Sequence, residues 1–241
     1  FFKQKTAYEI KECDWSSDVC SSDLEASGGL HLSAADLKTA LEPFRKARRK
    51  VGDKIDIMVD FHSLWNLTQA KRIAHALEEF EPYWLEDPVK MDNFDVLKDY
   101  ADSTRLTVCG SETLGTRADF REVIERRAVG IVMFDTSWIG GISEARKVAA
   151  LAETHHLPVA PHDATGPITL ISGNHVVMNA PNGLIQEIVR SYYYSWYCDI
   201  VTEMPKIENG MMPPLAGPGL GTQLQPDMLK RKDTKVRTTK A

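Results

Sequence analysis

From residue 55 onward, the chain alternates between short apolar runs and longer segments in which apolar residues recur every three or four positions. The short runs are rich in β-branched residues and have the length of strands, whereas the longer segments have the period of helices that bury one face. Alternating strands and helices are typical of α/β proteins with a parallel sheet. The pattern predicts strands at 55–60, 82–87, 106–112, 130–135, 157–162 and 183–189.

The same pattern predicts helices at 33–50, 70–80, 118–128 and 143–153. The first should begin after Ser33, a capping residue, and end at Gly52. The apolar face of the third consists of Phe120, Val123, Ile124 and Ala128. After residue 189 the pattern fades into a stretch rich in proline and glycine, and 226–241 is a polar C-terminal tail.

Residues 1–24 follow neither period. Translation of the flow-cell primer and read primer of a common short-read sequencing library gives Phe2–Ile10 and Cys13–Leu24 of this segment. We therefore interpret 1–24 as an artefactual leader, with a disordered natural leader as the alternative. It lacks the apolar centre of a secretory signal. The interpretation leaves one domain at 25–225, preceded by natural sequence that has been lost.

Composition mainly excludes classes of function. The net charge is −5 with no basic block, which argues against a nucleic-acid partner or an anionic membrane surface. No apolar run approaches the length of a membrane-spanning helix. Outside the leader only Cys109 and Cys198 remain, too few for a disulfide framework. We expect a cytoplasmic protein.

A chemically active side chain stands near the end of each predicted strand. These residues are Asp60, Glu86, Glu112, Asp135, His162 and Glu187. They are separated by 23 to 27 residues, close to one strand–helix unit of a barrel that spreads roughly 250 residues over eight units. The regular spacing favours a barrel over a doubly wound sheet, with all six residues at the same height on the rim where catalytic groups of barrels lie.

The first three of these residues are carboxylates that would face one centre. Asp60, Glu86 and Glu112 would repel each other unless a cation neutralised them, and oxygen ligands favour Mg²⁺ over Mn²⁺ or Ca²⁺. A single carboxylate at a strand end is more often a cap or a surface ion pair, but three in step favour a metal site. Spacing favours Glu86 over Asp87, which is expected to turn the chain before Pro88.

Seven motifs together resemble the enolase superfamily, specifically its mandelate racemase/muconate lactonizing enzyme branch. They are VDFH, WLEDPV, GSETL, FDTSWIGGISEARKVA, APHDATGP, LIQE and PGLGTQL, and the resemblance covers roughly residues 30–224. It implies a modified (β/α)₇β, TIM-like barrel with a separate α+β capping domain. This chain would hold the C-terminal part of that barrel, without its first two strands and without the N-terminal capping domain. The resemblance also implies that Asp60, Glu86 and Glu112 bind Mg²⁺.

The resemblance further implies proton abstraction alpha to a carboxylate. His162 would be the base, Asp135 would orient its imidazole, and Glu187 would donate a hydrogen bond to the substrate carboxylate. Taken alone, His162 would more often be a buried structural histidine, but Asp135 in step with it favours the base.

His62 separates the possible reactions. It lies two positions after Asp60, so on a strand it would point to the same face. Family members with Asp-x-His here use the histidine as the acid that protonates the departing β-hydroxyl, as in galactonate-type acid-sugar dehydratases. The alternative is a histidine that only contacts a substrate hydroxyl or a ligand carboxylate. Trp65, Asn66 and Trp138 could contact substrate, with packing as the alternative.

These inferences favour a Mg²⁺-dependent dehydratase that converts an aldonic or aldaric acid into its 2-keto-3-deoxy derivative. A small sugar acid would be its partner, and the intact parent is expected to be a homo-oligomer. Two alternatives remain: a racemase or epimerase of the same superfamily, and a truncated, noncatalytic metal-binding barrel fragment. The aromatic run at 192–197 predicts either a contact surface or core packing.

Overall fold

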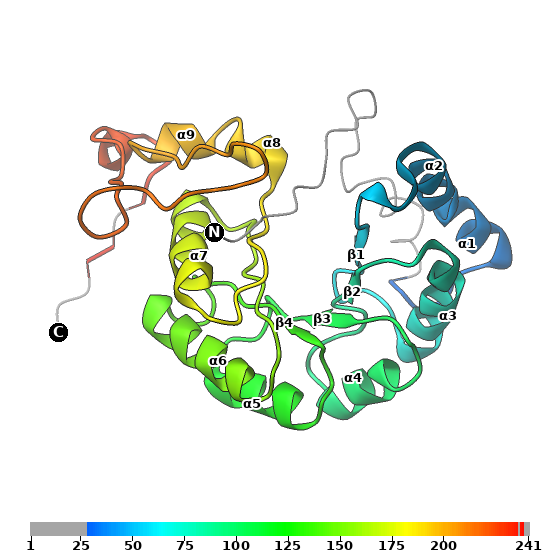
Figure 1. Cartoon of the computed structure of the whole chain (residues 1–241). Coiled ribbons are helices and arrows are strands. Elements are labelled where there is room, and N and C mark those ends of the chain that lie inside the picture. The colour runs from blue at the N-terminus through cyan, green and yellow to red at the C-terminus, as the bar shows by residue number, and fades with distance from the viewer. Residues whose placement is uncertain (1–27, 236, 239–241) are drawn as a thin grey trace.

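Strands lie on the inner side of an arc and helices cover its outer side (Figure 1). The computed structural model describes residues 28–235, 237 and 238, so the segment interpreted as a leader lies outside the described residues. Four strands form one parallel sheet in chain order: β1 Met58–Asp60, β2 Trp84–Glu86, β3 Val108–Gly110 and β4 Ile131–Val132. The register pairs Asp60 with Glu86, and Glu86 with Cys109.

The last two predicted strands continue the sheet only as extended segments. Single parallel bridges join Val132 to Val159 and Val159 to Gly183. Pro158 and Pro161 flank the first of these contacts, and proline has no N–H to donate to a ladder. The alternation of six parallel segments is therefore as predicted, but two of the six do not form continuous strands.

The helices include segments at the four predicted places. They are α1 Ala34–Ala40, α2 Glu42–Val51, α3 Leu67–Leu77, α4 Phe94–Ala101, α5 Arg117–Glu125, α6 Ile142–Thr154, α7 Pro167–Asn179, α8 Arg190–Tyr193 and α9 Tyr197–Ile200. Of these, α4, α7, α8 and α9 were not among the predictions. Short 3₁₀ turns are η3 Gly52–Lys54, η4 Glu78–Phe80 and η5 Met228–Lys230.

One prediction about these helices is wrong. The single helix expected at 33–50 is divided into α1 and α2 at Leu41. Pro43 stands in the first turn of α2, where its missing N–H costs nothing, whereas the interior of one long helix would lose a hydrogen bond there. The predicted ends are confirmed, because the Ser33 hydroxyl accepts from the N–H of Asp36 and Gly52 ends α2 with a φ of 56°.

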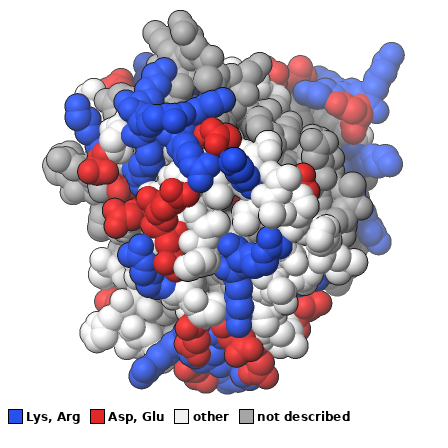
Figure 2. Space-filling model, turned by 90° about the vertical axis from the view of Figure 1, so that its right-hand side faces the viewer, with Lys and Arg blue, Asp and Glu red and all other residues white. Residues whose placement is uncertain are grey.

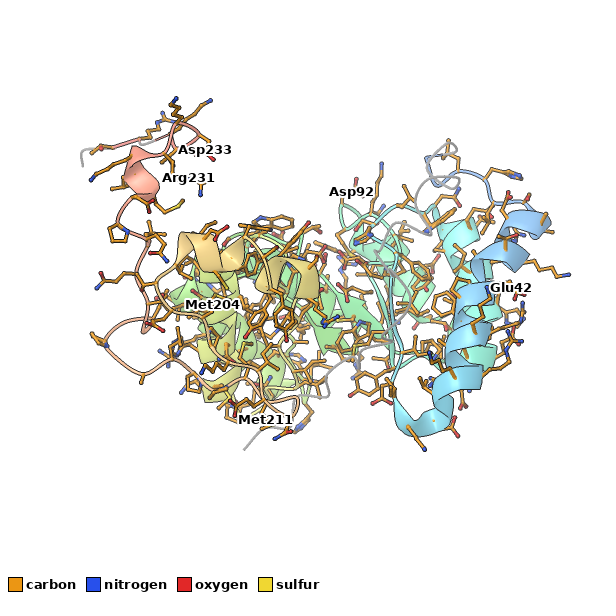
Figure 3. All side chains as sticks on the ribbon, turned by 90° about the horizontal axis from the view of Figure 1, so that it is seen from above. Glu42, Asp92, Met204, Met211, Arg231 and Asp233 are labelled. Carbon is orange, nitrogen blue, oxygen red and sulfur yellow. The ribbon has the colours of Figure 1, made fainter. Side chains whose placement is uncertain are left out.

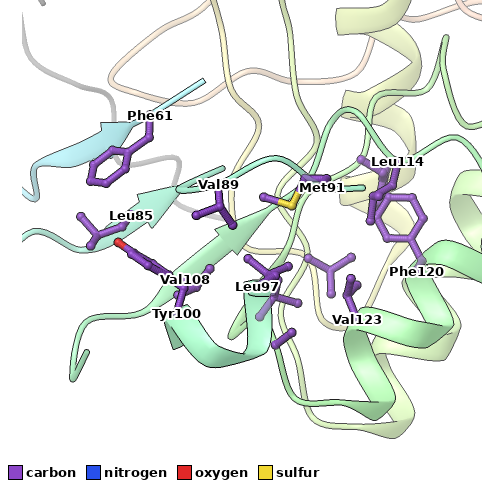
Figure 4. Packing of buried hydrophobic residues seen from close by; sticks show 14 of the residues in the cluster. Phe61, Leu85, Val89, Met91, Leu97, Tyr100, Val108, Leu114, Phe120 and Val123 are labelled. Carbon is purple, nitrogen blue, oxygen red and sulfur yellow. The ribbon is translucent and has the colours of Figure 1, made fainter. Parts of the chain in front are cut away.

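The main core lies between the sheet and the outer helices (Figure 4). The predicted face of α5 is buried there, with Phe120 and Val123 at 0% exposure. A second cluster lies on the inner face of the sheet and consists of Trp84, Cys109, Ile131, Met133 and Ala160. Strand alternation separates the two clusters, because Leu85 points outward while its neighbours Trp84 and Glu86 point inward.

The surface carries both signs of charge. Basic and acidic side chains intermingle on the face formed by the first helices (Figure 2). Seen from above, Glu42 lies at one end of the molecule, and Arg231 and Asp233 lie at the other, where they form an ion pair of 2.7 Å (Figure 3). Within the part of the chain that the structure describes, no helix combines the length and hydropathy that crossing a bilayer requires.

Candidate active site

The buried imidazole of His162 lies against the buried carboxylate of Asp135. Nδ1 of His162 is 2.8 Å from Oδ2 of Asp135. The same carboxylate accepts hydrogen bonds from the hydroxyl of Thr165 at 2.8 Å and from the N–H of Ser137 at 2.7 Å. A carboxylate accepts hydrogen bonds, so Nδ1 of His162 carries the proton and donates the hydrogen bond to Asp135. Nε2 is therefore the nitrogen that can accept a proton from a substrate.

The charges around this pair strengthen the imidazole as a base. Burial alone would lower the pKa of His162, but the hydrogen bond with Asp135 and the charges of Glu187 and Glu112 raise that pKa to about 9. For Asp135, burial acts to raise the pKa, and the hydrogen bonds from His162 and Thr165 outweigh it, so the pKa is lowered.

Glu187 lies on the other side of the imidazole. Its Oε2 is 3.9 Å from Nε2 of His162 and accepts a hydrogen bond from the N–H of Asp163 at 2.8 Å. Burial raises the pKa of Glu187 to about 7, although the charge of His162 acts to lower it. Glu187 can therefore be protonated near neutral pH, as its predicted role as a donor requires.

Asp60 and Glu86 lie side by side on neighbouring strands, since the register pairs them directly. Glu86 is buried on the inner face, where its Oε2 accepts a hydrogen bond of 3.0 Å from Nε1 of Trp84. Burial, followed by the charges of Glu187 and Asp60, raises the pKa of Glu86 well above its ordinary value. The charge of Asp60 thus opposes the ionisation of Glu86.

The prediction that each residue stands at the end of its strand is confirmed for Asp60 and Glu86 but is wrong for Glu112, and also for Asp135, because β4 ends at Val132. The register places Cys109 beside Glu86, and β3 ends at Gly110, so Glu112 lies in the turn beyond the strand. Its side chain is nevertheless buried near the other carboxylates, with Oε2 lacking a hydrogen-bond partner among the described residues.

Asp87 faces Glu112 from the turn after β2. Its Oδ2 accepts a hydrogen bond of 2.7 Å from the hydroxyl of Ser111. Its Oδ1 is buried and, like Oε2 of Glu112, has no partner among the described residues. Burial, with the charge of Glu112 and a carboxyl–carboxyl contact, raises the pKa of Asp87 well above its ordinary value. A shared proton or a cation would satisfy these two oxygens.

The donor set suits a hard cation, although the ligands do not form a closed cage. Across residues 28–235, 237 and 238, no three or more His, Cys, Asp or Glu side chains converge at metal-binding distances. The orphaned buried oxygen of Glu112 and the mutual repulsion at Glu86 are the features that a cation would relieve. The residues present therefore fit a hard cation such as Mg²⁺ in chemistry.

His62 lies beside Asp60 for a different reason from the one predicted. The strand ends at Asp60, and His62 stands in a turn with a φ of 49°, so strand alternation does not orient it. The turn folds the residue back: its N–H donates to Oδ1 of Asp60 at 2.8 Å, and its Nε2 is 2.5 Å from Oδ2. Oδ2 of Asp60 thus already contacts the imidazole of His62, and its second lone pair is left for a cation.

Comparison with known proteins shows the family to which the chain belongs. Residues 16–228 match the Enolase C-terminal domain-like family. The chain belongs to the enolase superfamily. Its fold is the barrel-like C-terminal domain of that superfamily, in the mandelate racemase branch. The match begins inside the segment that we interpret as a leader, and that interpretation stays a prediction.

Similar proteins of this superfamily include two curated dehydratases. D-xylonate dehydratase from Haloferax volcanii is 34% identical over 88% of this chain and 52% of that protein. D-galactonate dehydratase from Xanthomonas campestris pv. campestris is 32% identical over 83% of this chain and 53% of that protein. A crystal structure of an enolase of the mandelate racemase subgroup from Agrobacterium tumefaciens is 50% identical, with a TM-score of 0.81, over 86% of this chain and 56% of that one. The chain thus spans about half the length of the curated relatives.

The three predicted substrate contacts occupy different environments in this enolase-superfamily chain. Trp65 is buried in the main core. Asn66 caps α3, because its Oδ1 accepts from the N–H of Gln69 and its Nδ2 donates to the carbonyl of Leu30. Trp138 is 47% exposed, and its ring centroid is 6.0 Å from that of His162. Packing and capping thus account for the first two, and substrate contact stays a prediction for all three.

Sequence reasoning missed the polar residues that support the rim of this superfamily site. Thr165 and Thr169 share a hydrogen bond of 2.8 Å beneath Asp135, and Ser137 contacts Thr169. Asp163 is fully buried beside His162. The signals in the sequence were the position of Ser137 in the FDTSWIGGISEARKVA motif and that of Asp163 and Thr165 in the APHDATGP motif. Hydroxyl contacts between different turns have no period along the chain.

Proposed function

We propose that this chain is the larger part of the catalytic barrel of an acid-sugar dehydratase. The observation that carries the proposal is the buried His162–Asp135 pair, 2.8 Å apart, with Nε2 of the imidazole directed toward Glu187. The similarity to dehydratases of D-xylonate and D-galactonate supports this reaction class. Because this chain spans only about half the length of those relatives, the proposed activity is that of a longer enzyme.

His162 would remove the proton from the carbon next to the substrate carboxylate. Neutral Nε2 accepts the proton, and the electron pair of the broken C–H bond moves into the carboxylate to give an enediolate. A proton of this kind is weakly acidic and calls for a strong base. With its pKa raised to about 9, His162 is mostly protonated near pH 7, so its neutral, reactive fraction should grow as the pH rises toward that value. Glu187, protonated, would donate a hydrogen bond to a carboxylate oxygen as negative charge builds there.

The second half of the reaction expels the β-hydroxyl. As the carboxylate is restored, the electron pair between C1 and C2 of the enediolate forms a new double bond between C2 and C3, the bond from C3 to its hydroxyl oxygen breaks, and a proton from His62 converts the leaving group to water. The resulting enol becomes the 2-keto-3-deoxy acid by tautomerisation. His62 stands in an exposed turn next to Asp60, and the neighbouring carboxylate stabilises the proton on its imidazole.

Asp60, Glu86 and Glu112 would hold Mg²⁺, with Mn²⁺ as the substitute. When bound, the cation would neutralise negative charge that develops on the substrate carboxylate. The buried oxygen of Glu112 that lacks a partner among the described residues supports its place in this set.

The test is turnover by the longer enzyme that contains this chain. It is incubated with a panel of aldonic and aldaric acids, with Mg²⁺ or with EDTA, and formation of 2-keto acid is measured. We expect turnover only with the metal, and a loss on the order of 10³-fold in His162→Asn. The matched control is His155→Asn, a change at an exposed histidine.

Two outcomes would contradict the proposal. Epimerised substrate without keto acid would indicate a racemase, and an inactive enzyme across the panel would favour a noncatalytic barrel.

A further inference from the structure

Asp163 is a carboxylate that the proposed reaction does not use, and it is completely buried next to His162. Its Oδ1 accepts a hydrogen bond of 2.8 Å from the hydroxyl of Tyr197. Its Oδ2 accepts one of 3.1 Å from the N–H of Val189. Burial raises the pKa of this carboxyl to about 6, so these two donors support a group that is costly to ionise inside the protein.

Asp163 contacts the side chain of Glu187 and the backbone two residues beyond it. The N–H of Asp163 donates to Oε2 of Glu187 at 2.8 Å, while its carboxylate holds the N–H of Val189, two residues farther along. One residue therefore fixes both the side chain of Glu187 and the backbone that follows it. Since Asp163 directly follows His162, this N–H ties the backbone next to His162 to the carboxylate of Glu187.

Tyr197 extends this support to a distant part of the chain. It belongs to α9 and is buried, and its ring packs edge-on against Trp196 at 4.6 Å between centroids. The aromatic run at 192–197 thus divides, with Tyr193 and Tyr197 buried and Tyr194 at 65% exposure. Tyr193 also donates a buried hydrogen bond, but to the carbonyl of Pro205, which lies outside this network.

We propose that Asp163 and Tyr197 form a positioning pair that holds Glu187 in place opposite His162. The inference rests on the proposed function. It assigns no substrate contact to either residue, and both act through Glu187. A carboxylate is needed because two donors converge on it from different elements, and an asparagine at this position has only one oxygen to offer them.

The first test compares two substitutions in the longer enzyme that remove the same atom. Tyr197→Phe and Tyr193→Phe each delete one buried tyrosine hydroxyl from the same segment. We expect Tyr197→Phe to lower kcat by about 10- to 100-fold with KM changed by less than about twofold, because misplaced catalytic groups slow the chemical step. Tyr193→Phe should leave kcat within about twofold. Thermal unfolding of both variants shows whether they lose stability equally.

The second test uses the pH profile, which a loss of packing alone would not move. The negative charge of Asp163 helps to raise the pKa of Glu187. In Asp163→Asn that support is lost, so the limb of the kcat profile governed by Glu187 should shift to lower pH as well as fall in height.

The outcomes separate this inference from the proposed function. Turnover by the wild type with equal kcat in both phenylalanine variants, or an unshifted limb in Asp163→Asn, would overturn the positioning pair alone. A wild-type enzyme that turns over no sugar acid would overturn both.

Discussion

At the scale of single residues, the strength of the base depends on one hydrogen bond. We expect Asp135→Asn to lower the pKa of His162 from about 9, because the variant loses the charge that favours the imidazolium and keeps the burial that opposes it. The pKa is measured by NMR titration of the imidazole nitrogens. In the longer enzyme, kcat should fall on the order of 10²- to 10⁴-fold.

Asp95→Asn is the matched control, since its side chain is 82% exposed and pairs with Arg126 at the surface. If the titration of His162 were the same in Asp135→Asn as in this control, the proposed role of Asp135 would be wrong.

Residue spacing predicted which residues meet in the site better than it predicted how their side chains are oriented. The structure brings Asp135 to His162 and Asp60 to Glu86, as the regular intervals predicted. The orientation of His62 was not predictable, because its contact with Asp60 depends on a left-handed turn beyond the strand. Glu112 likewise lies past the end of β3. Strand periodicity describes a side chain only while the strand lasts.

At the scale of elements, α5 begins with a capping box, which we expect to raise the free energy of unfolding measurably. The Thr116 hydroxyl accepts from the N–H of Asp119 at 3.2 Å, and the Asp119 carboxylate accepts from the N–H of Thr116 at 3.1 Å. Thr116→Ala should lower the free energy of unfolding by about 1 kcal/mol, because it removes this cap. Urea unfolding of the chain measures the change.

The control for the cap is Thr39→Ala, an exposed position inside α1. Alanine has the higher helix propensity, so this change should be neutral or slightly stabilising. Equal losses in the two variants would show that the capping box contributes nothing of its own.

Elements with a strong period of apolar residues were predictable. Elements that a proline divides or interrupts were predictable only in part. The buried face of α5 follows directly from its apolar spacing. Pro43 divides the first helix, and Pro158 and Pro161 interrupt the fifth segment of the sheet. The period of apolar residues continues through a proline even where the hydrogen bonds cannot, so periodicity alone overestimates these elements.

At the scale of the whole molecule, the inner side of the arc concentrates acidic groups that are costly to ionise. Asp163 has a pKa of about 6 in place of 3.8, and Glu187 a pKa of about 7 in place of 4.5. A carboxyl whose pKa is higher in the folded chain stabilises the fold only while it is protonated. Each contribution is complete below the unfolded pKa and disappears as the pH rises through the folded value.

We therefore expect the metal-free chain to become less stable between pH 4 and pH 8. The share of Asp163 is on the order of 3 kcal/mol, and that of Glu187 is smaller because 36% of its side chain is exposed to screening water. His162, with its pKa raised from 6.5 to about 9, acts in the same direction between those two pH values. Urea unfolding in EDTA at several pH values measures the trend.

Asp163→Asn should flatten this trend below pH 7, whereas Asp102→Asn, at a side chain 65% exposed, should leave it unchanged. A stability that rises from pH 4 to pH 8 would mean that these carboxyls ionise freely in the folded chain, and that burial does not set their charge.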